Sequence, residues 1–148
     1  MGPMNYFLHF VLSLGILQAQ FISSPEIFSV KTMKANVHES PSNASPVLWH
    51  LWKFMPVKVI AYKEEWVKFS DLDGEEGWVH KSVLSEVPTV MVKVKEAQLH
   101  KSPGGPVVWI LDRGYSLRVF ASDGEWLEVS DLGSSSGWVH RGSVWGAR

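Results

Sequence analysis

Residues 66–80 read WVKFSDLDGEEGWVH and residues 126–140 read WLEVSDLGSSSGWVH, within a chain of 148 residues. The offset of 60 residues between these stretches holds back to Pro46, and residues 35–41 match residues 97–103 at an offset of 62. Similarity at a constant spacing is the signature of a structural unit that is used more than once. The sequence therefore predicts two copies of one small unit, with a loop that is two residues longer in the first copy.

Each copy has the composition and spacing of short β-strands. Val, Trp and Phe are abundant, and turn residues recur about every eight to twelve positions, as in a small sandwich or barrel. The Asp73-Gly74 pair predicts a tight type I′ hairpin turn, since both central positions of that turn need positive φ. We expect five strands in each copy, near residues 34–38, 47–52, 57–62, 65–69 and 76–79, and near residues 96–100, 107–111, 116–121, 125–130 and 136–139.

Tryptophan is expected to stabilise these small units. A core of this size supplies little stability by itself, and the absence of cysteine excludes disulfides. A buried aromatic side chain removes about 150–250 Å² from water. We therefore predict that the repeated tryptophans Trp66, Trp78, Trp126 and Trp138 are structural core residues. The short connector between the copies, which contains Pro88, predicts that the two units dock.

The N-terminus has the features of an export signal. Residues 1–19 contain no charged side chain and hold an apolar run from Tyr6 to Leu17. That run is shorter than the ~20 residues of a membrane span and has the length of a signal-peptide core. We expect a signal peptide at 1–19 and a linker at 20–32, with a buried apolar helix or an uncleaved anchor as the alternatives. The mature chain would be periplasmic or extracellular and would meet a membrane only during export.

Composition argues against several functions. The formal net charge of −1 argues against a nucleic-acid partner, because such proteins gather Lys and Arg to displace counterions from phosphates. Without cysteine there is no thiol catalysis and no thiolate metal site. Residues 133–137 match the letters of the G-x-S-x-G nucleophile motif, but that motif needs a strand-to-helix turn and no helix is predicted here. We expect a protein that is not an enzyme and needs no cofactor.

Four histidines occupy two equivalent positions in the two copies: His38, His80, His100 and His140. Imidazole is a common zinc ligand, so docked units could offer four nitrogens to one metal ion. The alternative is that copied histidines make copied hydrogen bonds, for instance from the imidazole to the carbonyl group of the turn after the Trp-Val strand. A two-histidine set without carboxylate or thiolate help is a weak metal site, and we assign no metal ligands.

Aromatic residues found in only one copy are the candidates for ligand binding, because the shared fold does not require them. Large aromatic side chains with a polar rim are typical of binding hot spots, and aromatic grooves capture extended peptides. We therefore predict ligand contacts at Trp52, Phe54, Tyr62, Tyr115 and Trp145. The alternative is that some of these side chains form the interface between the units.

The order of motifs is also informative. Each copy has a strand before a Ser-Pro loop, then a Pro-Val strand, a turn, an acid or Gly before Trp, and a hairpin that closes in Gly-Trp-Val. In the first copy these are residues 37–41, 46–47, 56–59, 65–67 and 73–79, and in the second 99–103, 106–107, 113–114, 124–126 and 137–139. This order resembles the bacterial SH3-like domain family, in its tandem-repeat branch found in exported proteins. Phe54 stands where the family usually has Gly, which predicts an altered or strained turn.

The resemblance implies an all-β fold of two tandem small SH3-like barrels of about five strands each, at residues 33–86 and 91–146. It also implies a binding role in the cell envelope, with cell-wall (peptidoglycan) peptide or an extended peptide of an envelope protein as the ligand. A structural or adaptor subunit that docks a protein partner is the alternative, and a His-based metal-binding protein is a minor one.

Overall fold

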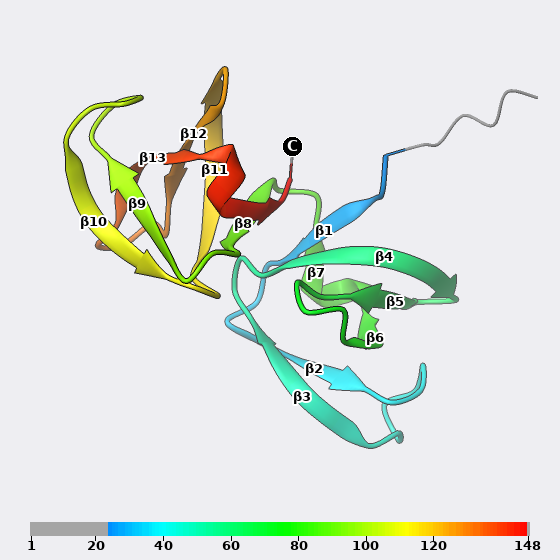
Figure 1. Cartoon of the computed structure of the whole chain (residues 1–148). Coiled ribbons are helices and arrows are strands. Elements are labelled where there is room, and N and C mark those ends of the chain that lie inside the picture. Colours follow the sequence, from blue (N-terminus) through cyan, green and yellow to red (C-terminus); the bar gives the residue numbers. More distant parts are fainter. Residues whose placement is uncertain (1–23, 148) are drawn as a thin grey trace, which may run out of the picture.

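The computed structural model describes residues 24–147, which form two all-β units. Figure 1 shows them as two separate lobes. The first contains β1 (Ile27–Val30), β2 (Lys34–His38), β3 (Val47–Trp52), β4 (Pro56–Lys63), β5 (Trp66–Ser70), β6 (Glu76–His80) and β7 (Leu84–Ser85). The second contains β8 (Thr89–Val92), β9 (Glu96–His100), β10 (Val107–Asp112), β11 (Ser116–Asp123), β12 (Trp126–Ser130), β13 (Ser136–His140) and β14 (Val144–Gly146).

The two sheets have the same topology. The first has seven strands in the order β3-β2-β6-β5-β4-β1-β7, and the second has seven in the order β10-β9-β13-β12-β11-β8-β14. In each unit a short 3-10 helix, η1 (Lys81–Val83) or η2 (Arg141–Ser143), precedes the last strand. Within residues 24–147 the structure contains no helix with the length and apolar character needed to cross a membrane.

All five predicted strands are present in each unit, and each sheet also contains two strands that the prediction lacked. β1 lies in the segment expected to be a linker, and β8 begins in the expected connector. β1 pairs with β4 and β7, and β8 pairs with β11 and β14. All four residues of β8 are buried, so the strand lacks the alternation that marks a half-buried strand. The predicted signal peptide at 1–19 lies outside the described residues.

The two cores are mainly aliphatic. In the first unit Val37, Val67, Phe69 and Val79 are fully buried, and in the second Leu99, Leu127 and Val139 hold the equivalent places. The prediction that the repeated tryptophans fill the cores is wrong for Trp78, Trp126 and Trp138, which are half-buried and lie outside both core clusters. Trp66 is buried as predicted, at 8% exposure, although it lies outside the main cluster of the first unit. Since side chains alternate along a strand, Val67 and Val79 face that cluster and their neighbours Trp66 and Trp78 lie on the opposite face of the strands.

The hairpin between β5 and β6 differs from the predicted type I′ turn. Gly74 has a φ of +84°, but Asp73 does not adopt positive φ, so the two-residue turn is wrong. Instead the Asp71 carboxylate accepts hydrogen bonds from the backbone amides of Asp73 and Glu75 at 2.9 Å each. The longer loop is therefore held by an Asx-type turn, in which a side-chain oxygen replaces a backbone acceptor.

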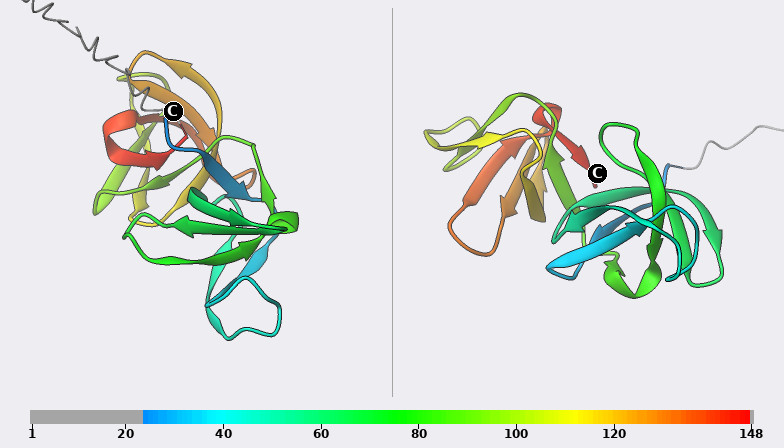
Figure 2. Two further views of the ribbon diagram at one scale, coloured as in Figure 1. Left: turned by 90° about the vertical axis from the view of Figure 1, so that its right-hand side faces the viewer. Right: turned by 90° about the horizontal axis from the view of Figure 1, so that it is seen from below.

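The units contact each other through a small surface. β4 of the first unit contacts β8 and β14 of the second, and the Arg113 guanidinium forms an ion pair with Asp73. Arg113 also donates a hydrogen bond to the carbonyl oxygen of Lys93. The two further views in Figure 2 show the same arrangement of two adjacent sheets joined by one connection.

Candidate functional site

In each unit a tryptophan lies between two histidines. The Trp66 ring makes edge-to-face contacts with His38 and with His80, with ring centroids 5.2 Å apart in both cases. In the second unit Trp126 contacts His100 at 4.9 Å and His140 at 5.4 Å in the same geometry. We call each of these arrangements a His-Trp-His cluster.

Strand register assembles the cluster. Trp66 on β5 is the cross-strand partner of His80 on β6, and His38 at the end of β2 pairs with Trp78 on β6. Directly opposed side chains on neighbouring strands lie on the same face. A register shift between Val37 and His38 lets both of these consecutive side chains be buried. The second unit repeats this register, so the cluster belongs to the shared fold.

The hydrogen bonds of the first histidine in each cluster define its tautomer. His38 Nδ1 lies 3.0 Å from the carbonyl oxygen of Ser45, and His100 Nδ1 lies 2.7 Å from that of Gly105. A carbonyl oxygen only accepts, so Nδ1 carries the hydrogen in both rings. The Nε2 atom of the neutral ring is then a hydrogen-bond acceptor.

The second histidine in each cluster has the opposite tautomer. His80 Nδ1 accepts the backbone N–H of Ser82 at 3.1 Å, and His140 Nδ1 accepts that of Gly142 at 3.0 Å. These bonds cap η1 and η2 at their N-termini. The neutral ring therefore carries its hydrogen on Nε2, which is a donor. Among residues 24–147 no hydrogen bond involves any of the four Nε2 atoms, so each cluster offers one acceptor and one donor to a ligand.

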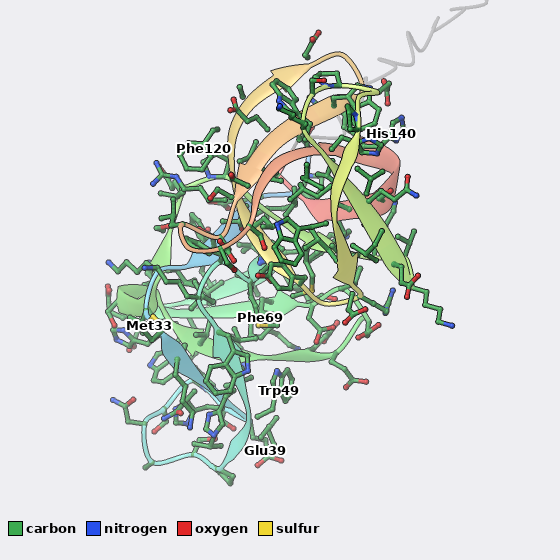
Figure 3. The ribbon with its side chains drawn as sticks, turned by 90° about the vertical axis from the view of Figure 1, so that its left-hand side faces the viewer. Met33, Glu39, Trp49, Phe69, Phe120 and His140 are labelled. Atoms are coloured by element: carbon green, nitrogen blue, oxygen red, sulfur yellow. The ribbon has the colours of Figure 1, made fainter. Side chains whose placement is uncertain are left out.

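Each cluster forms the wall of a cleft. The first cleft has a volume of about 470 Å³ and is lined by Lys34, Ala35, Asn36, His38, Asn43, Trp66, His80, Ser82 and Val83. The second has a volume of about 490 Å³ and is lined by Glu96, Gln98, His100, Gly104, Ile110, Trp126, His140 and Ser143. The two clefts share no lining residue and are separate. In Figure 3, Glu39 of the first unit and His140 of the second lie toward opposite ends of the molecule.

This geometry does not match the metal alternative. Within residues 24–147 no group of three or more His, Cys, Asp or Glu side chains could hold a metal ion together. The histidines of one unit are separated by an indole ring, and those of the two units do not converge. The histidines do make copied hydrogen bonds, but not as expected after the Trp-Val strand, where His80 and His140 accept backbone amides. The bonds to loop carbonyl groups are made by His38 and His100.

The predicted ligand residues Trp52 and Phe54 lie on β3 and on the turn that follows it. Trp52 is 55% exposed, and the Lys34 ammonium lies 5.7 Å from its ring centroid. Lys34 also lines the first cleft, so Trp52 lies beside that cleft. Phe54 is half-buried with a φ of +70°, and Gly114 at the equivalent position has +89°. The backbone therefore keeps the glycine-like conformation, which strains Phe54.

Tyr62 lies in a different place. Its hydroxyl donates to Glu26 at 2.7 Å, and the Lys81 ammonium lies 5.3 Å from its ring centroid. Burial of the hydroxyl, then the hydrogen bond to Glu26 and its negative charge, raise the pKa of Tyr62 to about 12. Tyr62 lines an apolar pocket of about 470 Å³ together with Phe28 and Leu84.

Tyr115 and Trp145 are also apart from the clusters. The Tyr115 hydroxyl donates to Asp131 at 2.7 Å, and this bond raises the pKa of Tyr115. Trp145 is half-buried on β14 and lines a pocket with Pro25 and Ile27 of the first unit. The five predicted aromatic residues thus do not gather at one site.

The clusters were accessible from the sequence but were not assigned as a site. The signal was that two histidines and one tryptophan recur together at nearly constant offsets. The expectation that function lies where the copies differ does not apply to these residues, because both copies have them. Repetition does not distinguish a structural from a functional role, because a duplicated unit also duplicates its ligand site.

Comparison with known families agrees with this topology. The sequence profile described as bacterial SH3 domain matches residues 31–86 and again residues 93–146. Each match falls largely on one of the two sheets. The chain therefore belongs to the bacterial SH3 domain family, of which it contains two tandem copies. None of the curated proteins compared with the chain matches it.

Several solved structures match the chain at low sequence identity. NlpC2 from Trichomonas vaginalis is 12% identical, with a TM-score of 0.39, and the match covers 82% of this chain and 48% of that one. An NlpC/P60 family protein from Bacillus cereus is 13% identical, with a TM-score of 0.40, over 81% and 56% of the two chains. A structure titled endolysin LysPBC5 CBD is 16% identical, with a TM-score of 0.34, over 81% and 92%. The chain spans about half the length of the first two structures.

Proposed function

We propose that this chain is an exported, non-enzymatic binding module that recognises peptide of the cell wall through its two His-Trp-His clefts. The observation that carries the proposal is the pair of opposite tautomers in each cleft. A peptide backbone offers N–H donors and C=O acceptors, which complement the Nε2 acceptor of His38 and the Nε2–H donor of His80. The indole between them offers an aromatic face of the kind that binding hot spots use.

Membership of the bacterial SH3 domain family supports a binding role, and the apolar N-terminal sequence supports export. We propose that Trp52 extends the first cleft, because Lys34 lies both over its ring and at the cleft wall. We also propose additional ligand contacts away from the clefts, at separate places on the surface: Phe54, Tyr62, Tyr115 and Trp145. In this function the protein would act outside the cytoplasm, on wall peptide or on a peptide of an envelope protein.

The test is sedimentation of the purified chain with isolated sacculi. The informative variant is the double substitution His80→Asn and His140→Asn. Asparagine is a good N-cap residue, so its side-chain oxygen can still accept the amides of Ser82 and Gly142, while the Nε2–H donor is lost. One hydrogen bond is worth about 0.5–1.5 kcal/mol, so we expect the affinity for sacculi to fall roughly three- to tenfold for each cleft.

The matched control is His50→Asn, the same change at an exposed histidine of β3 that does not line the first cleft. This variant should bind like the unmodified chain. The proposal is wrong if the unmodified chain does not sediment with sacculi, or if the double variant and the control bind equally.

A second candidate function is docking of a protein partner at β10. This edge strand exposes four consecutive apolar residues: Val107, Val108, Trp109 and Ile110 are 45%, 43%, 52% and 51% exposed. Beside it lies a cleft of about 560 Å³ lined by Trp109, Phe120 and Trp138. Exposed apolar edges are typical of sites where another chain pairs. Co-purification from the native envelope of one stoichiometric protein, lost in an Ile110→Lys variant, would favour this function.

A further inference from the structure

The two His-Trp-His clefts differ in the sign of one charge. Lys34 opens β2 and Glu96 opens β9 at the equivalent position, and each side chain is exposed. Within the described chain, Lys34 is the one charged residue that lines the first cleft, and Glu96 is the one that lines the second. The next lining position carries an amide in both, Asn36 or Gln98. The frame of the clefts is thus conserved between the copies, and its charge is inverted.

The acidic charge of the second cleft is not explained by folding. Glu96 is the cross-strand partner of Asp112, and like charges directly opposite each other destabilise a sheet. In the part of the chain that the structure describes, the ion pairs are Lys68 with Glu76 and Arg113 with Asp73. Neither Glu96 nor Asp112 is therefore neutralised by an ion pair, and a bound cationic group would relieve their repulsion.

In the first cleft the equivalent position carries a positive charge, and its cross-strand partner is aromatic. Lys34 is the cross-strand partner of Trp52, and its ammonium lies 5.7 Å from the Trp52 ring centroid. An aromatic partner holds the ammonium in place by a cation–π contact without cancelling its charge, as a carboxylate would. The Lys34 ammonium thus remains available to an anion.

The first cleft also contains a histidine nitrogen that has no hydrogen-bond partner among residues 24–147. His38 is only 6% exposed and lines the cleft. Its Nδ1 is used by the carbonyl oxygen of Ser45, and no hydrogen bond within residues 24–147 uses its Nε2. The Nε2 atom itself is not one of the buried unpartnered side-chain atoms of the described chain, which are Thr89 Oγ1, Ser116 Oγ and Arg118 Nε. It is therefore open to the cleft, where a ligand can donate a hydrogen bond to it.

We propose that the two clefts are specific for peptide ends of opposite charge: the first takes a peptide group next to a carboxylate, and the second takes a peptide group next to an ammonium. This inference rests on the proposed function, since it assumes that each cluster binds a peptide group. Peptides that carry both a free carboxylate and a free amine, as cross-linked wall peptides can, would then have a cleft for each. The structure assigns the carboxylate to Lys34 and the ammonium to Glu96 with Asp112.

The experiment is a ¹H–¹⁵N NMR titration of the chain with three probes that share one backbone. These are N-acetyl-Ala-Ala-methylamide, which is neutral, N-acetyl-Ala-Ala, which has a free carboxylate, and Ala-Ala-methylamide, which has a free amine. The amide signals of Ser82 and Gly142 report on the two clefts separately, because each amide donates to one cluster histidine. An exposed charge pair is worth up to about 1 kcal/mol, a factor of about five. We expect the carboxylate probe to bind the first cleft about fivefold more tightly than the second, and the amine probe to show the reverse.

The matched variants are Lys34→Glu and Glu96→Lys, which give each cleft the charge of the other. Both positions are exposed, and unchanged signals from the cores will verify that the variants are folded. We expect Lys34→Glu to abolish the carboxylate preference of the first cleft, and Glu96→Lys to create one in the second. Both preferences should shrink in high salt.

The outcomes separate the two proposals. If the neutral probe shifts both reporter amides but neither charged probe is preferred, the charge assignment is wrong and peptide binding by the clusters stands. If no probe shifts either amide, peptide binding by the clusters is wrong and the charge assignment falls with it. If both clefts prefer the same probe, the inversion is wrong.

Discussion

At the scale of single residues, one position shows what the repeat imposes on a side chain. Phe54 has a φ of +70° where Gly114 has +89°, and a Cβ at Gly114 would meet no atom within 4 Å. A left-handed conformation costs a non-glycine residue roughly 1–2 kcal/mol. We predict that Gly114→Ala destabilises the chain by about 1 kcal/mol through the backbone alone. Among variants that lack the ring, Phe54→Gly should be more stable than Phe54→Ala by ~0.5 kcal/mol, because only alanine keeps the strain, and this outweighs the added freedom that glycine gives the unfolded chain. Urea denaturation measures these changes, and equal stability of Phe54→Gly and Phe54→Ala would contradict the strain.

The raised pKa of the Tyr62 hydroxyl makes the stability of the fold depend on pH. Its pKa is about 12 because burial of the hydroxyl and then Glu26 disfavour the phenolate. The pKa is raised on folding, so this group contributes stability below its unfolded pKa of about 10, and that contribution is lost as the pH rises through 12. We predict that Glu26→Gln lowers the pKa of Tyr62 but leaves it above 10, since the effect of burial remains. Ultraviolet absorbance of the phenolate follows the titration, and Tyr62→Phe identifies the transition. An unchanged pKa in Glu26→Gln would show that Glu26 has no part in the shift.

At the scale of elements, the β12–β13 hairpin is held by one carboxylate. Asp131 Oδ1 accepts the amides of Gly133 and Ser135 at 2.8 and 3.0 Å, and Oδ2 accepts the Tyr115 hydroxyl at 2.7 Å. Burial acts to raise the pKa of Asp131, but these hydrogen bonds outweigh it and hold the pKa below its ordinary value. The ionised carboxylate therefore stabilises the fold above its unfolded pKa, and this stabilisation is lost as the pH falls through its folded pKa.

We predict that Tyr115→Phe costs about 0.5–1 kcal/mol at pH 7 and much less at a pH that is low enough to protonate Asp131. Urea denaturation at the two pH values measures the difference. Asp131→Asn is the control, because without the carboxylate the Tyr115 substitution should have no pH-dependent effect. A cost that is equal at both pH values would mean that the ring of Tyr115, and not its hydroxyl, matters.

The elements also show how far the sequence could predict the fold. Period-two alternation and turn residues located ten strands, because those signals are local. Four strands were not predicted. β8 is buried along its whole length and so does not alternate, and β1, β7 and β14 have only four, two and three residues. The type I′ turn was wrong because the Asp71 side chain competes for the backbone amides of the loop. The size of the repeated tryptophans predicts a core position, but side chains alternate along a strand. Because Val67 and Val79 face the core, the adjacent tryptophans lie on the other face.

At the scale of the whole molecule, duplication explains why the site was harder to predict than the fold. A histidine that makes the same hydrogen bond in both copies can be explained by the shared fold alone. Its repetition in the sequence therefore does not indicate a binding site. The feature that matters for binding is whether each Nε2 atom donates or accepts a hydrogen bond. That role depends on the tautomer, which the hydrogen-bond partner of Nδ1 determines and which only the folded structure shows. Differences between the copies are then expected to determine which ligand each cleft prefers, and not where the site lies. The clusters are common to both copies, and the difference between Lys34 and Glu96 separates them.

The relative orientation of the two units determines whether one ligand can occupy both clefts, and the ion pair between Arg113 and Asp73 is its main polar support. Both side chains are largely exposed, at 46% and 66%, so the pair contributes little stability. We predict that Asp73→Asn changes the free energy of unfolding by less than about 1 kcal/mol but widens the range of inter-unit orientations. Residual dipolar couplings of the two sheets measure that range.

Asp123→Asn, an exposed aspartate in neither ion pair, is the control. The charge exchange Asp73→Arg with Arg113→Asp should restore the original orientation, because it rebuilds the pair. If Asp73→Asn leaves the couplings unchanged, the contacts of β4 with β8 and β14 fix the orientation without the ion pair.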